Sequence, residues 1–170
     1  MENIAASAGF AIGTLYLYFE DKEALYMAVF VGKLTQMIDH VETCAREARQ
    51  PVDALRRAIG AQLEFHDRNR AFFEIFSRER PPAGKGTEWR AVCECFDRHT
   101  AVLRSLIEAG QRRRLLRKGD SQQLALMLLG MLLHLTRDLF QRGSSEPLAE
   151  QCEFVTELFL HGAAVERKAA

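Results

Sequence analysis

The sequence predicts an all-α protein, and three observations lead to that fold class. Apolar residues recur three and four positions apart along most of the chain, which is the spacing of one face of an α-helix. Alternating patterns of the kind that mark strands are absent, and only 4 of the 170 residues are proline. Hydrophobic residues make up 48% of the chain, so it can bury a core of its own.

Interruptions of the helical pattern separate about eight helices. Each interruption carries glycine, proline or a polar residue that can end or cap a helix. They fall at residues 8–10, 20–21, 50–51, 68–70, 81–86, 119–120 and 143–145.

The first long helix follows two short ones. Asp21 suits its N-cap, and it runs to about Arg49, which makes it on the order of 40 Å long. A helix of this length connects two parts of a molecule. Pro51 then suits the first turn of the next helix, and a shorter, phenylalanine-rich helix follows it.

Three further helices occupy the second half of the chain. A long amphipathic helix covers residues 89–116. Asp120 and Gln123 have the spacing of a capping box and open a helix that runs to about Gln141. That helix is apolar on nearly every side in its middle, so we expect it to be covered on both faces. The last helix carries a broad apolar stripe over residues 154–163.

Charge and cysteine content narrow the range of functions that the chain could have. With 23 basic and 23 acidic side chains, no global positive field attracts nucleic acid, so any DNA contact must be local. The four cysteines are scattered and the chain starts without an apolar leader, which favours reduced thiols in a cytoplasmic protein. The longest apolar run, residues 124–133, is shorter than the ~20 residues of a membrane span, so no membrane association is expected.

Residues 1–19 have the spacing of a helix-turn-helix DNA reader. Ile4 and Ala8 give a first helix its inward face, and Ala5 is small enough for a second helix to cross closely. Gly9 permits the positive φ that a tight turn needs. The first turn of the second helix, residues 11–14, would then enter the major groove.

The segments IAASAG, GTLYLYF and DKEAL follow one another without gaps and resemble the TetR/AcrR family of bacterial transcriptional repressors. IEAGQRRRLLRKGDSQQLALMLLGML and FVTELFLHGAA resemble the ligand-binding and dimerising region of that family in order and position. The middle third of the chain resembles the family only in its helix pattern.

The resemblance implies a helix-turn-helix head over residues 1–27 and a helical ligand-binding and dimerisation domain over residues 28–170. It implies a homodimer joined by a bundle of the last two helices of each subunit. It also implies a repressor that a small apolar or aromatic effector releases from double-stranded operator DNA, with the long helix from Asp21 as the lever.

The DNA-binding residues that the resemblance implies lie around the second helix. Thr14 and Tyr16 would reach the groove and its phosphates, Tyr18 would contact backbone, and Lys22 would hold a phosphate. For the two tyrosines, packing inside the head is the alternative. The full set is Ala11, Ile12, Gly13, Thr14, Tyr16, Tyr18 and Lys22.

The head departs from the family in three ways. Ala11 and Ile12 stand where the family usually has a capping residue and a basic or polar one, and alanine at an N-cap costs roughly 1 kcal/mol. Residues 1–25 carry four acids and one base, a net charge of −3 that opposes contact with phosphate. The family's first helix is absent from this sequence, so the head is expected to be incomplete. The chain is then either a piece of a longer repressor or a truncated helical sensor that no longer binds DNA tightly.

Aromatic and methionine side chains concentrate in the helices that surround the effector in the resembling family. We expect an apolar or aromatic ligand, with His99, His134 or Arg98 as polar anchors; the alternative for each residue is an ordinary core position. The candidate ligand-binding residues are Phe65, Phe72, Phe76, Trp89, Phe96, His99, Met127 and Met131.

The last two long helices are the predicted dimer interface, because their apolar surfaces exceed what one small subunit can bury. Spacing alone leaves open which faces pair. The candidate residues are Leu128, Leu132, Leu135, Phe154, Leu158 and Phe159.

Catalytic and metal chemistry are not expected. The sequence has no nucleophile–base–acid set and no phosphate-binding loop, so we predict neither an enzyme nor a cofactor. Cys95 and His99 share a helix face but lack a third metal ligand, and Cys93 points away from Cys95; redox sensing stays a minor alternative. The basic run at 111–118 is interpreted as a solvated helix end, with nucleic acid or a membrane surface as the alternatives.

Overall fold

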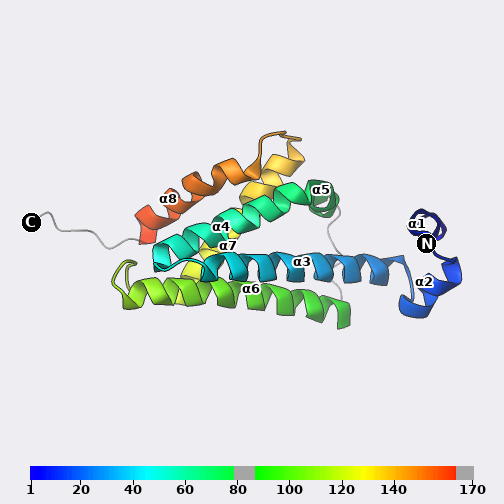
Figure 1. The fold of residues 1–170 in the computed structure, drawn as a ribbon, viewed down its shortest axis with the longest axis horizontal. Coiled ribbons are helices and arrows are strands. Elements are labelled where there is room, and N and C mark those ends of the chain that lie inside the picture. The colour runs from blue at the N-terminus through cyan, green and yellow to red at the C-terminus, as the bar shows by residue number, and fades with distance from the viewer. Residues whose placement is uncertain (79–86, 164–170) are drawn as a thin grey trace, which may run out of the picture.

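The computed structural model describes residues 1–78 and 87–163, and all regular structure in these residues is helical (Figure 1), which confirms the predicted all-α class. The break predicted at residues 81–86 lies outside the described residues. The elements, in chain order, are α1 Glu2–Ala8, α2 Ile12–Tyr18, α3 Lys22–Arg46, α4 Pro51–Arg68, α5 Arg70–Arg78, α6 Thr87–Arg112, α7 Ser121–Gln141, the 3₁₀ turn η1 Leu148–Gln151 and α8 Cys152–Ala163.

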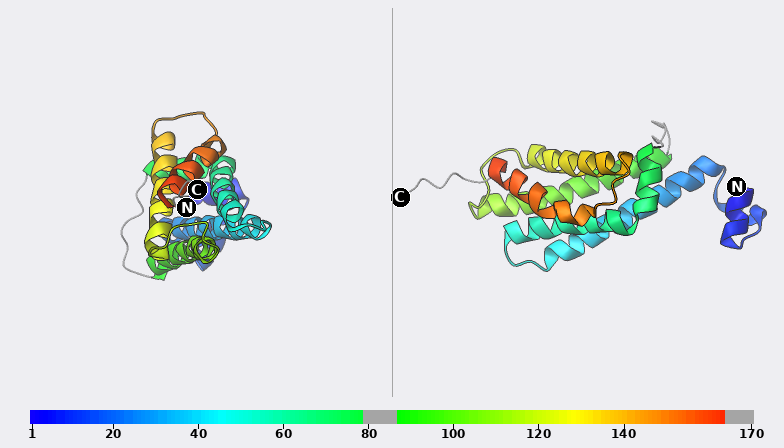
Figure 2. Two further views of the ribbon diagram at one scale, coloured as in Figure 1. Left: turned by 90° about the vertical axis from the view of Figure 1, so that its left-hand side faces the viewer. Right: turned by 90° about the horizontal axis from the view of Figure 1, so that it is seen from above.

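Helix α3 carries the head away from the rest of the molecule (Figures 1 and 2). The short helices α1 and α2 pack on each other at one end of α3, while α4 and α6 pack along its other part. With 25 residues, α3 is about 38 Å long. It therefore spans from the head to the far end of the larger domain.

Local signals fix both ends of α3. The Asp21 carboxylate accepts a hydrogen bond from the backbone N–H of Ala24 at 2.8 Å, as an N-cap should. The helix ends at Arg46 rather than at Arg49. Gln50 has the extended backbone that a residue before proline prefers, so the chain has to leave the helix before Pro51.

The core of the larger domain lies where α4, α6, α7 and α8 meet. Its large, fully buried side chains come mainly from α4, α6 and α7 and include Leu55, Ile59, Leu63, Leu103, Ile107, Leu128 and Leu132. A second cluster around Phe30, Met37 and Ile38 of α3 joins α3 to α6.

Helix α7 is covered on one face only. Seven of its side chains are buried, but Leu126, Met127 and Leu133 are exposed, so the subunit itself covers one face of α7 and a partner would have to cover the other. Its length and composition alone would let it cross a membrane, uniquely among the described helices. In the structure it packs on α5 and α6, as a core helix does.

A polar clamp holds the α7–α8 connection against α4 and α5. The Asp67 carboxylate accepts hydrogen bonds from the backbone N–H groups of Leu148 and Ala149, both at 2.9 Å, and pairs with Arg70 at 2.9 Å. Arg70 in turn donates to the carbonyl oxygens of Ser144 and Glu146 at 2.6 and 2.7 Å. The clamp therefore fixes where η1 and α8 begin.

Candidate functional site

The head has the helix-turn-helix geometry that the sequence predicts. Gly9 ends α1 in the left-handed conformation, with φ of 72°, and the Phe10 N–H donates to the Ala5 carbonyl oxygen at 2.9 Å. Ala11 stands at the N-cap of α2 without a side-chain hydrogen bond. The first turn of α2 is therefore held by its backbone alone.

The candidate DNA-binding residues lie on or near the surface of the head. Tyr16 and Tyr18 are 53% and 76% exposed, so neither ring packs inside the head. Thr14 is half-buried, whereas the remaining candidates, Ala11, Ile12, Gly13 and Lys22, are exposed. All seven are thus placed at one end of the molecule, and Lys22 is their only cation.

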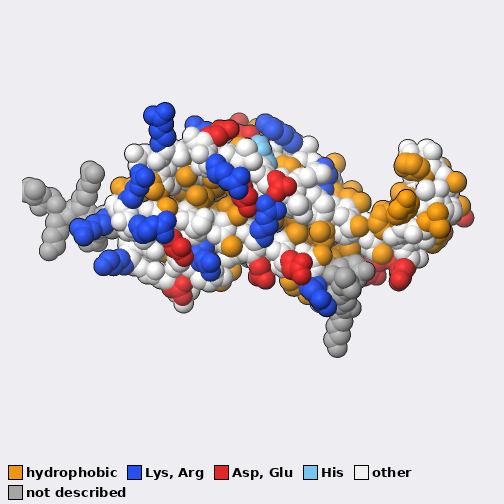
Figure 3. Space-filling view, turned by 60° about the horizontal axis from the view of Figure 1, so that its bottom comes forward, with side chains coloured by type: hydrophobic (Ala, Val, Ile, Leu, Met, Phe, Trp, Pro, Cys, Tyr) orange, Lys and Arg blue, Asp and Glu red, His pale blue; other side chains and the backbone are white. Residues whose placement is uncertain are grey.

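Apolar side chains are also exposed on the head (Figure 3). A hollow of about 360 Å³ is lined by Met1, Ile4, Ile12 and Tyr16, with polar neighbours that include Lys22. Phe10 and Leu17 of the head are exposed as well. Exposed apolar surface of this kind is characteristic of a contact surface.

Three buried polar side chains occupy the facing helices α4 and α6. Gln62, His66 and His99 are at most 3% exposed, and each has a buried nitrogen or oxygen without a hydrogen-bond partner. Gln62 and His66 lie one turn apart on α4, so they share a face. We call these three residues the buried polar cluster. Thr136 on α7 is a fourth buried residue with an unpartnered polar atom.

Both histidines of the buried polar cluster are neutral at pH 7. Burial, and then the proximity of His99, lowers the pKa of His66 to about 4. Burial alone lowers the pKa of His99 to about 4. Each ring can therefore accept one hydrogen bond and donate another. Unpartnered buried polar atoms are rare in folded proteins and call for an explanation.

Two aromatic candidates for ligand binding, Phe65 and Phe72, lie near this cluster. His66 contacts the ring of Phe73 edge-on at 4.3 Å between centroids, and Phe65 and Phe72 also pack on Phe73. Phe65, Phe72, Phe96 and Met131 are half-buried against the core, and Trp89 is half-buried in the α3–α6 cluster.

Three expected contributors lie elsewhere. Met127 is 61% exposed, because it is on the open face of α7. His134 is exposed, and Arg98 pairs with Asp39 and Glu42 of α3 on the surface. The side chain of Phe76 lies outside the described residues.

Sequence reasoning missed Gln62, His66 and Thr136. A signal for the first two was present: they continue the inward stripe of α4 that Leu55 and Ile59 begin, at spacings of four, three and four residues. A glutamine and a histidine on such a stripe are buried with the leucines. Thr136 had no comparable signal, because α7 is apolar on most sides.

The candidate dimer residues divide into two groups. Leu128, Leu132 and Phe159 are buried inside the subunit and leave no surface for a partner, and Leu135 is half-buried against the core. Phe154 and Leu158 are 61% and 54% exposed. Figure 2 shows α7 and α8 running next to each other. Their exposed apolar residues are Leu126, Met127, Leu133, Phe154 and Leu158.

The four cysteines are free thiols. Burial raises the pKa of Cys44 and of Cys152, which makes both less reactive. Among residues 1–78 and 87–163, no group of three or more His, Cys, Asp or Glu side chains could hold a metal ion.

Comparisons with known proteins identify both parts of the chain. A family model described as "Tetracyclin repressor-like, C-terminal domain" matches residues 48–163. A second, described as "Bacterial regulatory proteins, tetR family", matches residues 1–29. Both families consist of regulators rather than enzymes.

Individual relatives agree with the family models. A fatty acid metabolism regulator protein of Bacillus subtilis is 36% identical over 59 residues, which are 35% of this chain and only 30% of that protein. Among solved structures, FadR of Bacillus subtilis in complex with stearoyl-CoA matches with a TM-score of 0.83 and 21% identity, over 95% of this chain and 87% of that one. The TetR family regulator PfmR of Thermus thermophilus matches with a TM-score of 0.77 and 22% identity, over 98% and 88%. At these identities the two structures show the shared fold.

Proposed function

Because the chain belongs to the TetR family of bacterial regulatory proteins, we propose that it is a repressor that leaves its operator DNA when a small molecule binds within the larger domain. The observation that carries this proposal is the buried polar cluster, whose polar atoms lack partners in an otherwise apolar core. A ligand that satisfies these atoms favours the conformation that binds it. That preference is what a ligand needs to shift a conformational equilibrium.

The chemistry of the cluster favours a long apolar ligand with a neutral polar group. The ring of Phe73 contacts His66, and Arg98, the cation that directly precedes His99, pairs with Asp39 and Glu42 on the surface instead. A buried carboxylate would lack a charged partner there and would incur a large desolvation penalty. A carbonyl oxygen could instead accept a hydrogen bond from either imidazole.

We therefore propose a fatty acyl thioester as the effector. FadR of Bacillus subtilis has been solved with stearoyl-CoA, and the curated relative is a fatty acid metabolism regulator. The acyl chain would contact Phe65, Phe72, Phe96 and Met131, and the thioester carbonyl would lie near His66 and His99. A free fatty acid should bind less well, because its carboxylate is charged.

For DNA, we propose that the head over residues 1–27 places the first turn of α2 in the major groove. Thr14, Tyr16, Tyr18 and Lys22 would supply the polar contacts, and Ile12 could contact a thymine methyl group. The net charge of −3 over residues 1–25 and the uncapped start of α2 favour a second candidate. In it, the chain is a helical sensor with weak DNA affinity.

We further propose a cytoplasmic homodimer formed by the domain over residues 28–170. The exposed apolar residues of α7 and α8 would form its interface, with Phe154 and Leu158 retained from the sequence prediction. Leu126, Met127 and Leu133 would join them, because all three are exposed on the part of α7 that the core leaves open.

Fluorescence anisotropy with labelled DNA from upstream of the protein's own gene tests the proposal. We expect salt-sensitive binding that stearoyl-CoA reverses at lower concentration than stearate or CoA alone. Replacing His99 with leucine should weaken the response to stearoyl-CoA about tenfold or more, the loss expected when a buried hydrogen bond to the ligand is removed. DNA affinity without effector should not change.

Two results would separate the candidates. If the full-length protein shows no sequence preference on that DNA at low salt, it is not an operator-binding repressor. The helical sensor with weak DNA affinity is then the remaining candidate function. If DNA binds but acyl-CoA of any chain length leaves it bound, the effector class is wrong.

A further inference from the structure

A groove of about 360 Å³ lies where α3 ends, α4 begins and α6 ends. Figure 1 shows these helix ends at the end of the larger domain that is farthest from the head. Its floor is apolar and consists of Ala45, Ala48, Pro51, Ala54, Leu106 and Ala109. Its polar lining consists of Arg49, Gln50, Arg112 and Arg113. We call it the arginine groove.

No carboxylate side chain in the lining compensates the arginines of the groove. Three of its lining residues are arginines and none is acidic. Arg113 donates to the side-chain oxygen of Gln50, which is neutral, at 2.9 Å. Within the described chain, no carboxylate lies within 4 Å of Arg49 or Arg112 to form an ion pair. Three guanidinium groups around one hollow repel one another unless an anion joins them.

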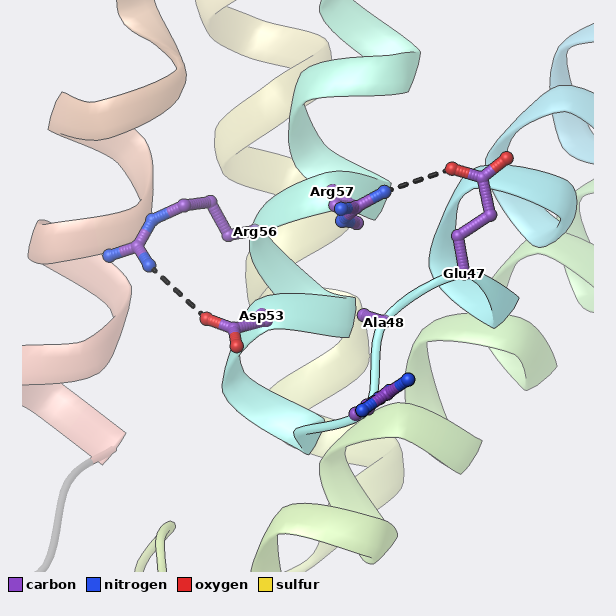
Figure 4. Close-up of a pocket in the computed structure, with 6 residues that line it drawn as sticks. Glu47, Ala48, Asp53, Arg56 and Arg57 are labelled. Atoms are coloured by element: carbon purple, nitrogen blue, oxygen red, sulfur yellow. Dashed lines mark hydrogen bonds and ion pairs between the residues drawn. The ribbon is translucent and has the colours of Figure 1, made fainter.

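Nearby acids are already paired. An adjoining groove shares Ala48 and Arg49 with the arginine groove and contains two carboxylates. Figure 4 shows these turned toward other arginines: Glu47 pairs with Arg57 at 2.9 Å, and Asp53 with Arg56 at 3.7 Å. These acids therefore do not neutralise Arg49.

The start of α4 contributes a partial positive charge to the groove. Gln50 is its N-cap residue but makes no side-chain capping bond, and the N-terminal end of a helix is partially positive. The C-terminal ends of α3 and α6 at the same groove are partially negative, so the guanidinium groups would supply most of the attraction for an anion. The end of α6 contributes Arg112 and Arg113 to the same groove. An anion there would face cationic groups from two helices.

We propose that the arginine groove binds a small organic anion that carries one or more phosphate groups. Guanidinium groups match phosphate oxygens in geometry and stay charged at every physiological pH. The alanine and leucine floor suits the apolar part of such a molecule, and the volume lies in the range of small-molecule sites. The phosphate could belong to a free nucleotide or to the phosphorylated headgroup of an acyl thioester. The site does not depend on the function proposed above.

Isothermal titration with adenosine 3′,5′-bisphosphate tests the proposal. We expect saturable binding to the wild-type protein. The double variant Arg49→Gln/Arg112→Gln should lose about tenfold or more in affinity, because two charge-assisted contacts are removed. The matched control is Arg117→Gln/Lys118→Gln, which removes the same charge from exposed residues outside the groove. Its affinity should change less than about threefold, since exposed charges act there only at a distance.

A titration with stearoyl-CoA identifies the source of the phosphate. If the double variant also weakens stearoyl-CoA binding, the groove holds the headgroup of that molecule. If stearoyl-CoA binds the variant and the wild type equally, the groove serves free nucleotides. Both results support a phosphate-binding site in the groove. Neither result depends on whether acyl-CoA releases the protein from DNA.

Three results would overturn the proposal. The first is the absence of saturable binding to the wild type, which would leave only a solvated cationic surface. The second is an equal loss of affinity in the double variant and its control. The third is tighter binding of a poly-glutamate peptide than of the bisphosphate, which would make the groove a protein-docking surface. Unchanged thermal unfolding of both variants establishes that they are folded.

Discussion

Replacing Gln62 with methionine should stabilise the effector-free protein and weaken its response to effector. Gln62 is fully buried, and neither its amide nitrogen nor its amide oxygen has a partner. Methionine has a similar length and an unbranched, adaptable side chain. The change therefore removes two unsatisfied polar atoms while it keeps most of the packing of α4.

The size of the effect follows from these contacts. An unsatisfied buried polar atom costs about 1–3 kcal/mol, and a hydrophobic replacement of similar volume costs less than about 1.5 kcal/mol in repacking. Two such atoms together cost about 2–6 kcal/mol, so even after the cost of repacking the free energy of unfolding should rise by at least about 0.5 kcal/mol. For a chain of this size, each kcal/mol corresponds to an increase in Tm of about 2–4 °C.

Thermal unfolding followed by circular dichroism measures the change, on delipidated protein at one fixed concentration, because dimerisation also shifts Tm. Gln122→Met provides the control, since Gln122 is an exposed glutamine on the first turn of α7. A lower Tm for Gln62→Met than for wild type would refute the reasoning, because it would mean that the Gln62 amide is satisfied in the effector-free protein.

Three further predictions concern pH, the polar clamp and the dimer. Because His66 and His99 have a pKa of about 4 when folded and about 6.5 when unfolded, stability is lost as pH falls through this range; by pH 5 the loss is about 2 kcal/mol for each histidine. Urea titrations of the wild type at pH 7 and pH 5 should show this loss of stability, and the loss should be smaller in His99→Gln. An equal loss in the two proteins would contradict the lowered pKa of His99. Asp67→Ala removes two hydrogen bonds to backbone and one ion pair and should cost about 2–3 kcal/mol by chemical denaturation, whereas Asp138→Ala, which removes an exposed pair with Arg142, should cost less than about 1 kcal/mol. Phe154→Glu with Leu158→Glu should give a monomer in sedimentation equilibrium, and an unchanged mass would exclude this surface as the interface.

Features of the fold that depend on neighbouring residues were predictable from the sequence. The turn at Gly9 and the cap at Asp21 each rest on one residue and its backbone neighbours. Proline at position 51 set the start of α4 in the same local way. The predicted end of α3 is three residues too late, because Glu47, Ala48 and Arg49 are good helix formers and the local sequence before Pro51 carries no stop signal.

The faces of α7 were not predictable. Its middle is apolar in nearly every direction, so periodicity carries no information about which side faces the core. Leu128 and Leu132 are buried, while Leu126 and Met127, which differ little from them in chemistry, are exposed. The positions of the helices packed against α7, mainly α6 and α5, decide between these sides. For the same reason, nothing in the sequence indicated that the hydroxyl of Thr136 is buried.

The buried polar cluster lies next to contacts that join α4 and α6 to α3. Lys33 of α3 donates to the side-chain oxygen of Asn69 at 2.9 Å, and Asn69 follows His66 by less than one helical turn. Arg98 pairs with two carboxylates of α3 at 2.7 and 3.1 Å, and it directly precedes His99. Each histidine is thus within one turn of a side chain that binds α3. A ligand that shifts either ring would move a segment that also contacts α3, and α3 carries the head at its other end (Figure 2). These contacts are a candidate route by which the proposed effector would act on the head without contacting it.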